Sequence, residues 1–140
     1  MTVRTWVTLS VLVLVALTIA VFVRLRQPAP VPEILARVGD TRITGELVSS
    51  CWPQSGGETV CKDAPDGSAP RPVPVPEEGR LRFVAYPVEP RDAVIELAGT
   101  TYDWDDDIDY ELDSGEYEIS LEADYGGGNR VSYAFAIRVG

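Results

Sequence analysis

The chain has 140 residues, and its charge and composition limit the classes of protein to which it can belong. From Gln27 onward, nine Arg or Lys stand against 22 Asp or Glu, a formal charge of −13. Such a surface repels nucleic acid, which excludes DNA or RNA as a partner. The absence of histidine removes the usual general base at neutral pH and every Ser-His-Asp or Cys-His catalytic arrangement.

Residues 1–26 predict a transmembrane helix. The run from Val7 to Val23 contains no charged residue, and arginines stand on both sides of it. About twenty such residues, flanks included, span a hydrocarbon core of roughly 30 Å. A cleaved signal peptide is the alternative, with Thr18-Ile19-Ala20 as the cut site, but this site lies inside the apolar run. We expect an uncleaved signal-anchor and therefore a single-pass membrane protein.

The orientation in the membrane follows from the two cysteines, because the positive charges on the two sides of the helix nearly balance. Cys51 and Cys61 lie ten positions apart in a small domain that a disulfide would stabilise. Disulfides persist in oxidising compartments. We therefore predict a Cys51–Cys61 disulfide that clips one loop, and a C-terminal domain outside the cytoplasm. Free thiols are the main alternative, since a redox pair is usually Cys-x-x-Cys.

After the helix, residues 27–39 are rich in proline and predict an extended stalk of about 3 Å per residue. Residues 40–140 predict a domain of short strands. Alternating apolar positions mark strands at 42–48, 80–86, 93–98, 116–125 and 131–139, with a short edge strand at 73–75. About seven strands joined by turns rich in Pro and Gly indicate an all-β fold, a two-sheet antiparallel sandwich.

One turn before the last two strands carries a family resemblance. Leu112, Gly115 and Tyr117 fit the L-x-x-G-x-Y arrangement of a tyrosine corner, in which the Tyr hydroxyl bonds back across the turn. Here, and along the tail 115–139, the chain resembles bacterial immunoglobulin-like and fibronectin-III-like domains of lipoproteins and envelope proteins. The segments 50–52 and 61–65 resemble one such group. The resemblance covers most of residues 40–140 and implies an immunoglobulin-like sandwich outside the cytoplasm, without an activity.

The most unusual feature is a stretch in which alternate residues are acidic: Asp103, Asp105, Asp107, Asp109, Glu111 and Asp113. Along one strand these side chains would line one face about 6.5–7 Å apart, so water, calcium or a basic partner must offset their repulsion. The stretch begins like an EF-hand loop, but Ile108 and Ser114 occupy the positions of the required Gly and Glu. A solvated edge, a looser calcium site at Asp103, Asp105, Asp107 and Asp109, and a docking surface for a basic partner remain as interpretations.

Trp52 and Trp104 are further binding candidates, because exposed indole rings stack on carbohydrates or partner proteins. The alternatives are that Trp52 packs over the disulfide and that Trp104 is half-buried in the core. Paired carboxylates also serve glycoside hydrolysis. However, a domain this small lacks a substrate cleft, and exposed carboxylates would not acquire the raised pKa that a general acid needs.

These observations predict a non-enzymatic, membrane-tethered cell-envelope module that binds an envelope partner or scaffolds outside the cytoplasm. The alternative is a calcium-stabilised sandwich, in which the acidic stretch 103–113 holds the ion. Calcium is the only cofactor that the sequence suggests. An extracytoplasmic enzyme is the least expected of the three.

Overall fold

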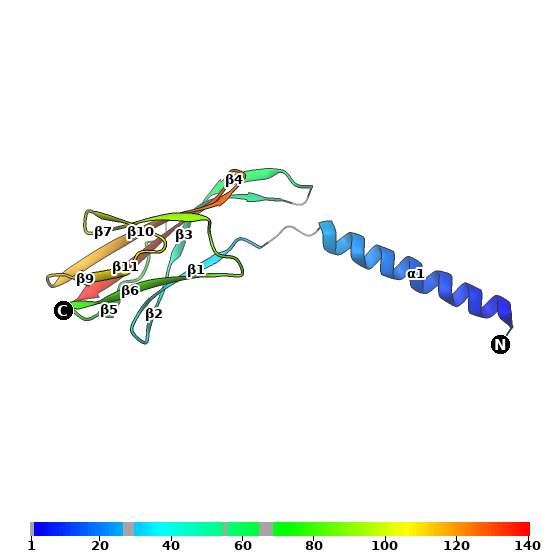
Figure 1. Cartoon of the computed structure of the whole chain (residues 1–140), viewed down its shortest axis with the longest axis horizontal. Helices are drawn as coiled ribbons and strands as arrows, with labels where there is room; N and C mark the ends of the chain where they lie inside the picture. The colour runs from blue at the N-terminus through cyan, green and yellow to red at the C-terminus, as the bar shows by residue number, and fades with distance from the viewer. Residues whose placement is uncertain (1, 27–29, 55, 65–68) are drawn as a thin grey trace. The chain divides into compact units, whose positions relative to one another are not determined.

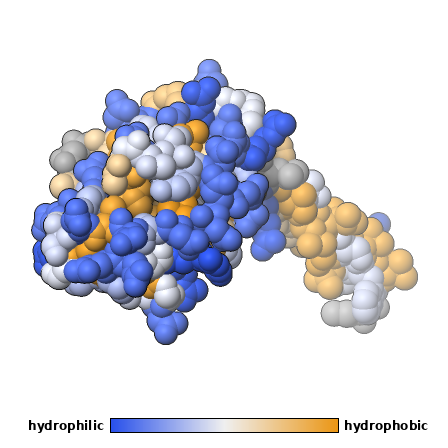
Figure 2. Space-filling view, turned by 60° about the vertical axis from the view of Figure 1, so that its left-hand side comes forward, coloured by the Kyte–Doolittle hydropathy of each residue, from blue (hydrophilic) through white to orange (hydrophobic). Residues whose placement is uncertain are grey.

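The computed structural model describes residues 2–26, 30–54, 56–64 and 69–140 (Figure 1). Helix α1 spans Val3–Arg26, and the most apolar 18-residue stretch within Val3–Arg24 has a mean hydropathy of 2.7, with no residue of it buried. Figure 2 shows hydrophobic residues over the visible side of this helix. The predicted apolar helix is thus confirmed. Its length and composition suit both a retained membrane anchor and a signal sequence.

The hydroxyl groups inside α1 are satisfied by the helix itself. Ser10 Oγ donates to the carbonyl of Trp6 at 2.9 Å, and Thr18 Oγ1 donates to the carbonyl of Leu14 at 2.8 Å. Such bonds to the preceding turn remove the need for water, which hydrocarbon cannot supply. The few polar side chains of α1 are therefore compatible with a lipid surrounding.

Residues 30–52 and 59–140 form one compact unit of two packed sheets. The smaller sheet has the order β2 (Thr41–Thr44), β1 (Glu33–Val38), β6 (Glu78–Tyr86), β9 (Ile108–Glu111). The larger has the order β4 (Thr59–Asp63), β3 (Glu46–Pro53), β11 (Asn129–Val139), β10 (Gly115–Gly126), β7 (Asp92–Leu97), β8 (Thr100–Asp103), with β5 (Val73–Val75) beside β11. Only β5 pairs in parallel among the described strand pairs. The predicted two-sheet sandwich is confirmed, with eleven described strands where about seven were expected.

The long hairpin β10–β11 supplies much of the core. The predicted inward positions lie on one face of each strand, and the other face of β10 meets water. On the other face of β11, Ala134 and Ala136 are buried as well. Ile119, Leu121, Phe135 and Ile137 are at most 1% exposed, and they lie among the buried residues of both sheets. Tyr117 and Tyr125, at the two ends of β10, are only partly buried against this core.

The first strand, β1, begins inside the segment assigned to the stalk from the sequence. Ile34, Ala36 and Val38 are buried, and β1 pairs with both β2 and β6. Tyr133 donates a buried hydrogen bond of 2.8 Å to the carbonyl of Pro32, which fixes the start of the domain. The prolines at 28–32 concealed this strand, because they break the alternating pattern just before it begins.

The disulfide between Cys51 and Cys61 is confirmed, and it joins two strands instead of closing an irregular loop. The Gln54 amide donates to Glu58 and the Ala64 amide donates to Val48, each at 2.8 Å. Both bonds belong to one antiparallel register, in which Cys51 lies directly opposite Cys61. The two cysteines form a pair without backbone hydrogen bonds, the kind in which side chains approach most closely. The disulfide therefore staples the β3–β4 hairpin.

Candidate functional site

The acidic stretch does not form one strand, which corrects the arrangement expected from its alternation. Asp103 ends β8 in the larger sheet, and Asp109 lies in β9 of the smaller sheet. Between them, the Asp103 amide donates to Asp106 Oδ2 at 2.8 Å and the Asp106 amide donates to the Asp103 carbonyl at 3.1 Å. This side-chain bond closes a turn between the sheets, so the carboxylates are distributed over two sheets and a turn.

One of the four predicted calcium ligands, Asp109, is bonded to an arginine. Arg80 Nε donates to Asp109 Oδ1 at 2.8 Å, and Arg80 Nη2 donates to Asp109 Oδ2 at 3.3 Å. The hydrogen bond from Arg80 holds the pKa of Asp109 below its usual value. Asp105 and Asp107 are exposed in the turn. Within the described residues, no three His, Cys, Asp or Glu side chains gather where they could share a metal ion.

The two tryptophans contribute to the core. Trp52 is 8% exposed, and its ring meets Tyr125 edge-on with centroids 5.2 Å apart. Neighbouring residues of a strand point to opposite faces, so Trp52 points inward while Cys51 points outward. Trp104 is partly buried and lies against Phe83, with centroids 6.4 Å apart. Trp52 is therefore buried and Trp104 partly buried, which are the packing alternatives that the sequence raised.

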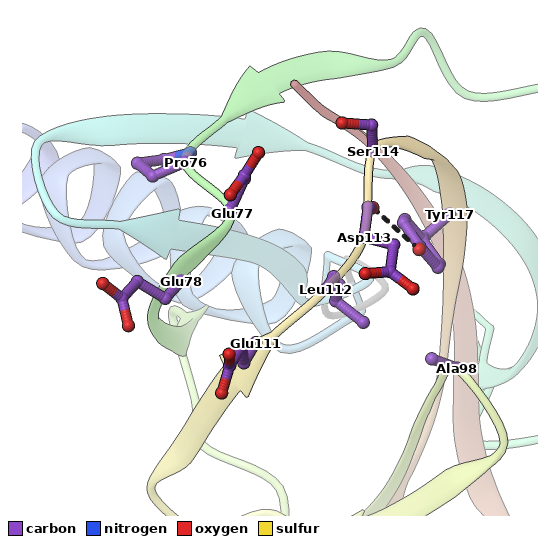
Figure 3. Close-up of a pocket in the computed structure, with 9 residues that line it drawn as sticks. All are labelled: Pro76, Glu77, Glu78, Ala98, Glu111, Leu112, Asp113, Ser114 and Tyr117. Carbon is purple, nitrogen blue, oxygen red and sulfur yellow. Dashed lines mark hydrogen bonds between the residues drawn. The ribbon is translucent and has the colours of Figure 1, made fainter.

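The turn before β10 has the geometry that the L-x-x-G-x-Y pattern implies. Tyr117 donates its hydroxyl hydrogen to the carbonyl of Asp113 at 2.9 Å (Figure 3). Gly115 adopts a positive φ of 155°, which favours glycine at the bend into the strand. Leu112 and Tyr117 both pack partly against the core. The bond closes the turn that brings the chain from β9 into β10, and this turn borders a groove.

The groove has a volume of about 850 Å³ and is open to solvent. It is lined by Pro76, Glu77, Glu78, Ala98, Glu111, Leu112, Asp113, Ser114 and Tyr117. Figure 3 shows the segment 111–114 lying between residues 76–78 and the pair Ala98 and Tyr117. Four of the nine lining residues carry carboxylates and none carries a positive charge, so the groove has a negative potential.

Two hydrogen bonds join the connections that form the groove. The Leu112 amide donates to the carbonyl of Glu77 at 2.8 Å, and the Tyr110 hydroxyl donates to the carbonyl of Pro76 at 3.1 Å. Burial raises the pKa of Tyr110, so its hydroxyl stays a donor throughout the neutral range. Gly79 lies opposite Tyr110, and a side chain there would come within 2.9 Å of the Tyr110 hydroxyl. The position of the two acidic connections is thus fixed by backbone carbonyls.

Ala98 borders the groove in a conformation that alanine rarely adopts. It has φ 51° and is followed by Gly99 with φ 79°, in the tight turn between β7 and β8. Two positive φ values mark the hairpin turn in which Asn-Gly is the usual pair. Residues in sparsely populated backbone conformations cluster at active sites, ligand-binding segments and switch regions. Here the methyl group leaves the groove open beside Tyr117.

Strand register places the groove within the domain. At one end of β6, Tyr86 pairs with Glu33, where the chain enters the sheet. At the other end, Glu78 pairs with Glu111, and both line the groove. A strand of this length extends about 25 Å at roughly 3.3 Å per residue. The groove and the chain entry therefore lie at opposite ends of β6.

The groove is not predicted by any local pattern in the sequence, because its residues come from separate connections. Glu77 and Glu78 lie at the end of a Pro-rich loop and were assigned no role, whereas Leu112 and Tyr117 entered only as a structural motif. A pair of acids directly after Pro76 was the one available signal. Comparison with protein-family models, curated proteins and solved structures finds no match to this chain.

Proposed function

We propose that this chain is a non-enzymatic, membrane-tethered module that binds a partner outside the cytoplasm through the groove at residues 76–78, 98, 111–114 and 117. The proposal rests on one combination above all: an exposed apolar helix long enough to cross a membrane, followed by a small sandwich stapled by a disulfide. A stable disulfide is typical of oxidising compartments, which favours a domain outside the cytoplasm.

The charge of the groove supports a basic partner. Glu77, Glu78, Glu111 and Asp113 come from two connections that hydrogen bonds hold together. Leu112 and Tyr117 add apolar surface beside the carboxylates. An extended segment with Lys or Arg at alternate positions would place its cations at the acids and its stems against these side chains. Because the groove is open, we expect salt to weaken such binding strongly.

The location of the groove also supports this function. It lies at the end of β6 that is remote from the chain entry at Glu33. A partner can therefore reach it without displacing the segment that leads to the anchor. The two packed sheets and the Tyr117–Asp113 bond further support an immunoglobulin-like relationship, which we include in the proposal.

The anchoring is tested by fractionation of the full chain from its own host. We expect the protein to stay with membranes after treatment with carbonate or high salt, because an apolar helix and not charge holds it there. Mass spectrometry of the N-terminus supplies the second measurement. A soluble form beginning near Val21 would show that the helix is a cleaved signal peptide.

The groove is tested with defined peptides and the full chain in detergent micelles. An alternating Lys-Val peptide should shift the amide NMR signals of Ala98, Leu112 and Tyr117, and a Glu-Val peptide should not. The shifts should disappear in the variant Glu77→Gln, Glu78→Gln, Glu111→Gln, Asp113→Asn. A control with the same change in charge on the larger sheet, Glu96→Gln, Glu118→Gln, Glu122→Gln, Asp92→Asn, should keep them. If both variants lose the peptide-induced shifts equally, the binding depends on net charge alone, and the proposed groove site is contradicted.

A further inference from the structure

The outer face of the smaller sheet carries a row of three arginines. Arg37 of β1 lies opposite Arg42 of β2 on one side and opposite Arg82 of β6 on the other, and all three are exposed. Neighbouring strands are about 4.8 Å apart, so the three side chains stand in a line about 10 Å long. Like charges directly opposite each other destabilise a sheet. This row therefore has a cost to folding, although the Asp109 carboxylate attracts Arg82 at one end of the row.

Arg80, the next arginine along β6, differs from these three because it forms an ion pair. Arg80, two positions from Arg82 on the same strand, is bonded to Asp109 of β9. Among the described residues, no ion pair includes Arg37, Arg42 or Arg82. The domain as a whole carries nine basic against 22 acidic residues. On such an acidic domain, a row of arginines outside the described ion pairs is a local reversal of charge.

Apolar side chains continue this face toward the chain entry. Leu35 pairs with Val84 in the next row, and Glu33 pairs with Tyr86 in the row after that. Val84 is 48% exposed and Tyr86 is 74% exposed. A hollow of about 470 Å³ on the same face is lined by Arg37, Gly39, Arg80, Arg82 and Val84. The face thus combines cations, a hollow, aliphatic surface and an exposed tyrosine, with Glu33 as the acid in its last row.

The length of the connection to α1 limits the distance of this face from a membrane. Helix α1 ends at Arg26, and β1 begins at Glu33, seven residues later. Seven residues span at most about 25 Å when fully extended. Tyr86, the last residue of β6, lies directly opposite Glu33, the first residue of β1. If α1 stays in a bilayer, the surface of that bilayer is within reach of the face.

We propose that the outer face of β2, β1 and β6, with the row Arg37, Arg42 and Arg82 at its centre, docks on anionic lipid headgroups of the membrane that holds α1. One guanidinium group can donate two parallel hydrogen bonds to two oxygens of a phosphate. Tyrosine is enriched at the headgroup layer, because its ring is apolar and its hydroxyl is polar. The remaining acidic surface is repelled by the same lipids, which turns this face toward them.

Tethering makes such docking effective even if each contact is weak. A module held by its own chain binds at the high effective concentration that a short linker gives. The inference rests on the proposed anchoring by α1 and is independent of what the groove binds. A second copy of this chain, presenting its acidic turn at 103–107, is the competing occupant. A lipid surface is favoured because the apolar rows adjoin the arginines on the side of the chain entry.

The test uses the full chain, labelled for NMR, in nanodiscs that contain a gadolinium-chelating lipid. One set of discs is phosphatidylcholine alone, and the other contains about one-third phosphatidylglycerol. We expect the amide signals of Leu35, Arg37, Arg82 and Val84 to broaden in the phosphatidylglycerol discs, while those of Glu96 and Ser120 on the larger sheet stay sharp. About 0.5 M salt should reverse the broadening, since exposed charges are then screened.

Two triple variants separate the face from net charge. Arg37→Gln, Arg42→Gln, Arg82→Gln should abolish the broadening. Arg91→Gln, Arg130→Gln, Arg138→Gln makes the same change in charge outside this face and should keep it. Broadening that survives the first variant overturns the proposal, as does broadening without lipid that grows with protein concentration, which would assign the face to a second copy. If the chain is not retained in the discs, the anchoring fails; if it is retained without selective broadening, only the docking fails.

Discussion

The ring of Phe135 occupies the space in which a side chain at Gly45 would lie. A β-carbon at Gly45 would come within 2.6 Å of Phe135 Cε1 and 2.8 Å of Cζ. Gly45 lies between β2 of the smaller sheet and β3 of the larger one, where the chain crosses from one sheet to the other. The missing side chain thus lets the largest fully buried residue of the core pack against the crossing.

Gly45→Ala should lower the free energy of unfolding by about 1–3 kcal/mol, the usual cost of an additional methyl group in a packed core. Phe135 is 0% exposed, and two neighbouring rings prevent it from moving aside. Its ring centroid is 5.4 Å from that of Phe83, which meets it edge-on, and 6.2 Å from that of Tyr133, which stacks on it. Urea denaturation followed by tryptophan fluorescence measures the change.

The double variant provides the control for this prediction. In a Phe135→Leu background, Gly45→Ala should cost less than it does in the native chain, because the ring that it meets is gone. Equal costs in the two backgrounds would show that the loss comes from the backbone at residue 45 and not from the contact with Phe135.

Tyr117→Phe should lower the free energy of unfolding by about 0.5–1.5 kcal/mol, the net value of one hydrogen bond whose acceptor remains accessible to water. Tyr117 donates to the Asp113 carbonyl at 2.9 Å, and Asp113 is exposed. Tyr86→Phe is the matched control, because its side chain is 74% exposed. If the two substitutions have equal effects in urea melts, the hydroxyl of Tyr117 contributes nothing to the turn.

Alkaline pH should destabilise the domain through Tyr125. Burial, followed by the smaller effects of Tyr133 and Glu89, raises the pKa of Tyr125 to about 12. An unfolded tyrosine ionises near pH 10, so between about pH 10 and 12 the unfolded chain releases a proton that the folded chain keeps. The contribution of Tyr125 to the free energy of unfolding is therefore fully present below about pH 10 and is lost as the pH rises toward 12.

The measurement is a series of urea melts from about pH 8 to about pH 11.5, with native chain and Tyr125→Phe compared at each pH. Free energy of unfolding should fall more steeply with pH in the native chain, since the variant has no phenol at this position. Parallel curves would mean that Tyr125 titrates alike in the folded and unfolded states.

The sequence predicts those strands that have one dry and one wet face along their whole length. In β10, apolar positions from Tyr117 to Tyr125 alternate with polar ones, and the structure buries or partly buries them as expected. In β11 the expected positions are buried, but Ala134 and Ala136 between them are buried as well. The strand β1 was missed although Ile34, Ala36 and Val38 alternate, because prolines directly before it suggested a continuous stalk. The alternation of apolar residues therefore fails to reveal a strand that begins directly after a Pro-rich segment.

The candidate sites show a second limit. Alternating acids from Asp103 to Asp113 fit one strand as well as two strands and a turn, and only the bond from the Asp103 amide to Asp106 distinguishes the two. The groove joins Glu77 to Leu112 through a backbone bond between segments 35 positions apart. No periodicity along the chain encodes such a contact, because it depends on how the two sheets pack.

The last prediction concerns calcium, the alternative that the sequence raised for the acidic stretch. With Asp109 bonded to Arg80 and no three described carboxylates gathered around one point, we expect no specific calcium site. Sodium and calcium at matched ionic strength should then raise the melting temperature alike, because both only screen the repulsion between exposed acids.

A specific site would behave differently. Its stabilisation would follow RT ln(1 + [Ca]/Kd) and continue to grow with calcium after the matched sodium curve had levelled off. Extracellular modules bind calcium at about 0.1–1 mM, so the titration must pass through that range. Asp105→Asn with Asp107→Asn decides the outcome, because these two exposed carboxylates lie in the turn between β8 and β9. A calcium-specific rise that this pair of substitutions removes would make ion binding, and not a solvated edge, the role of residues 103–109.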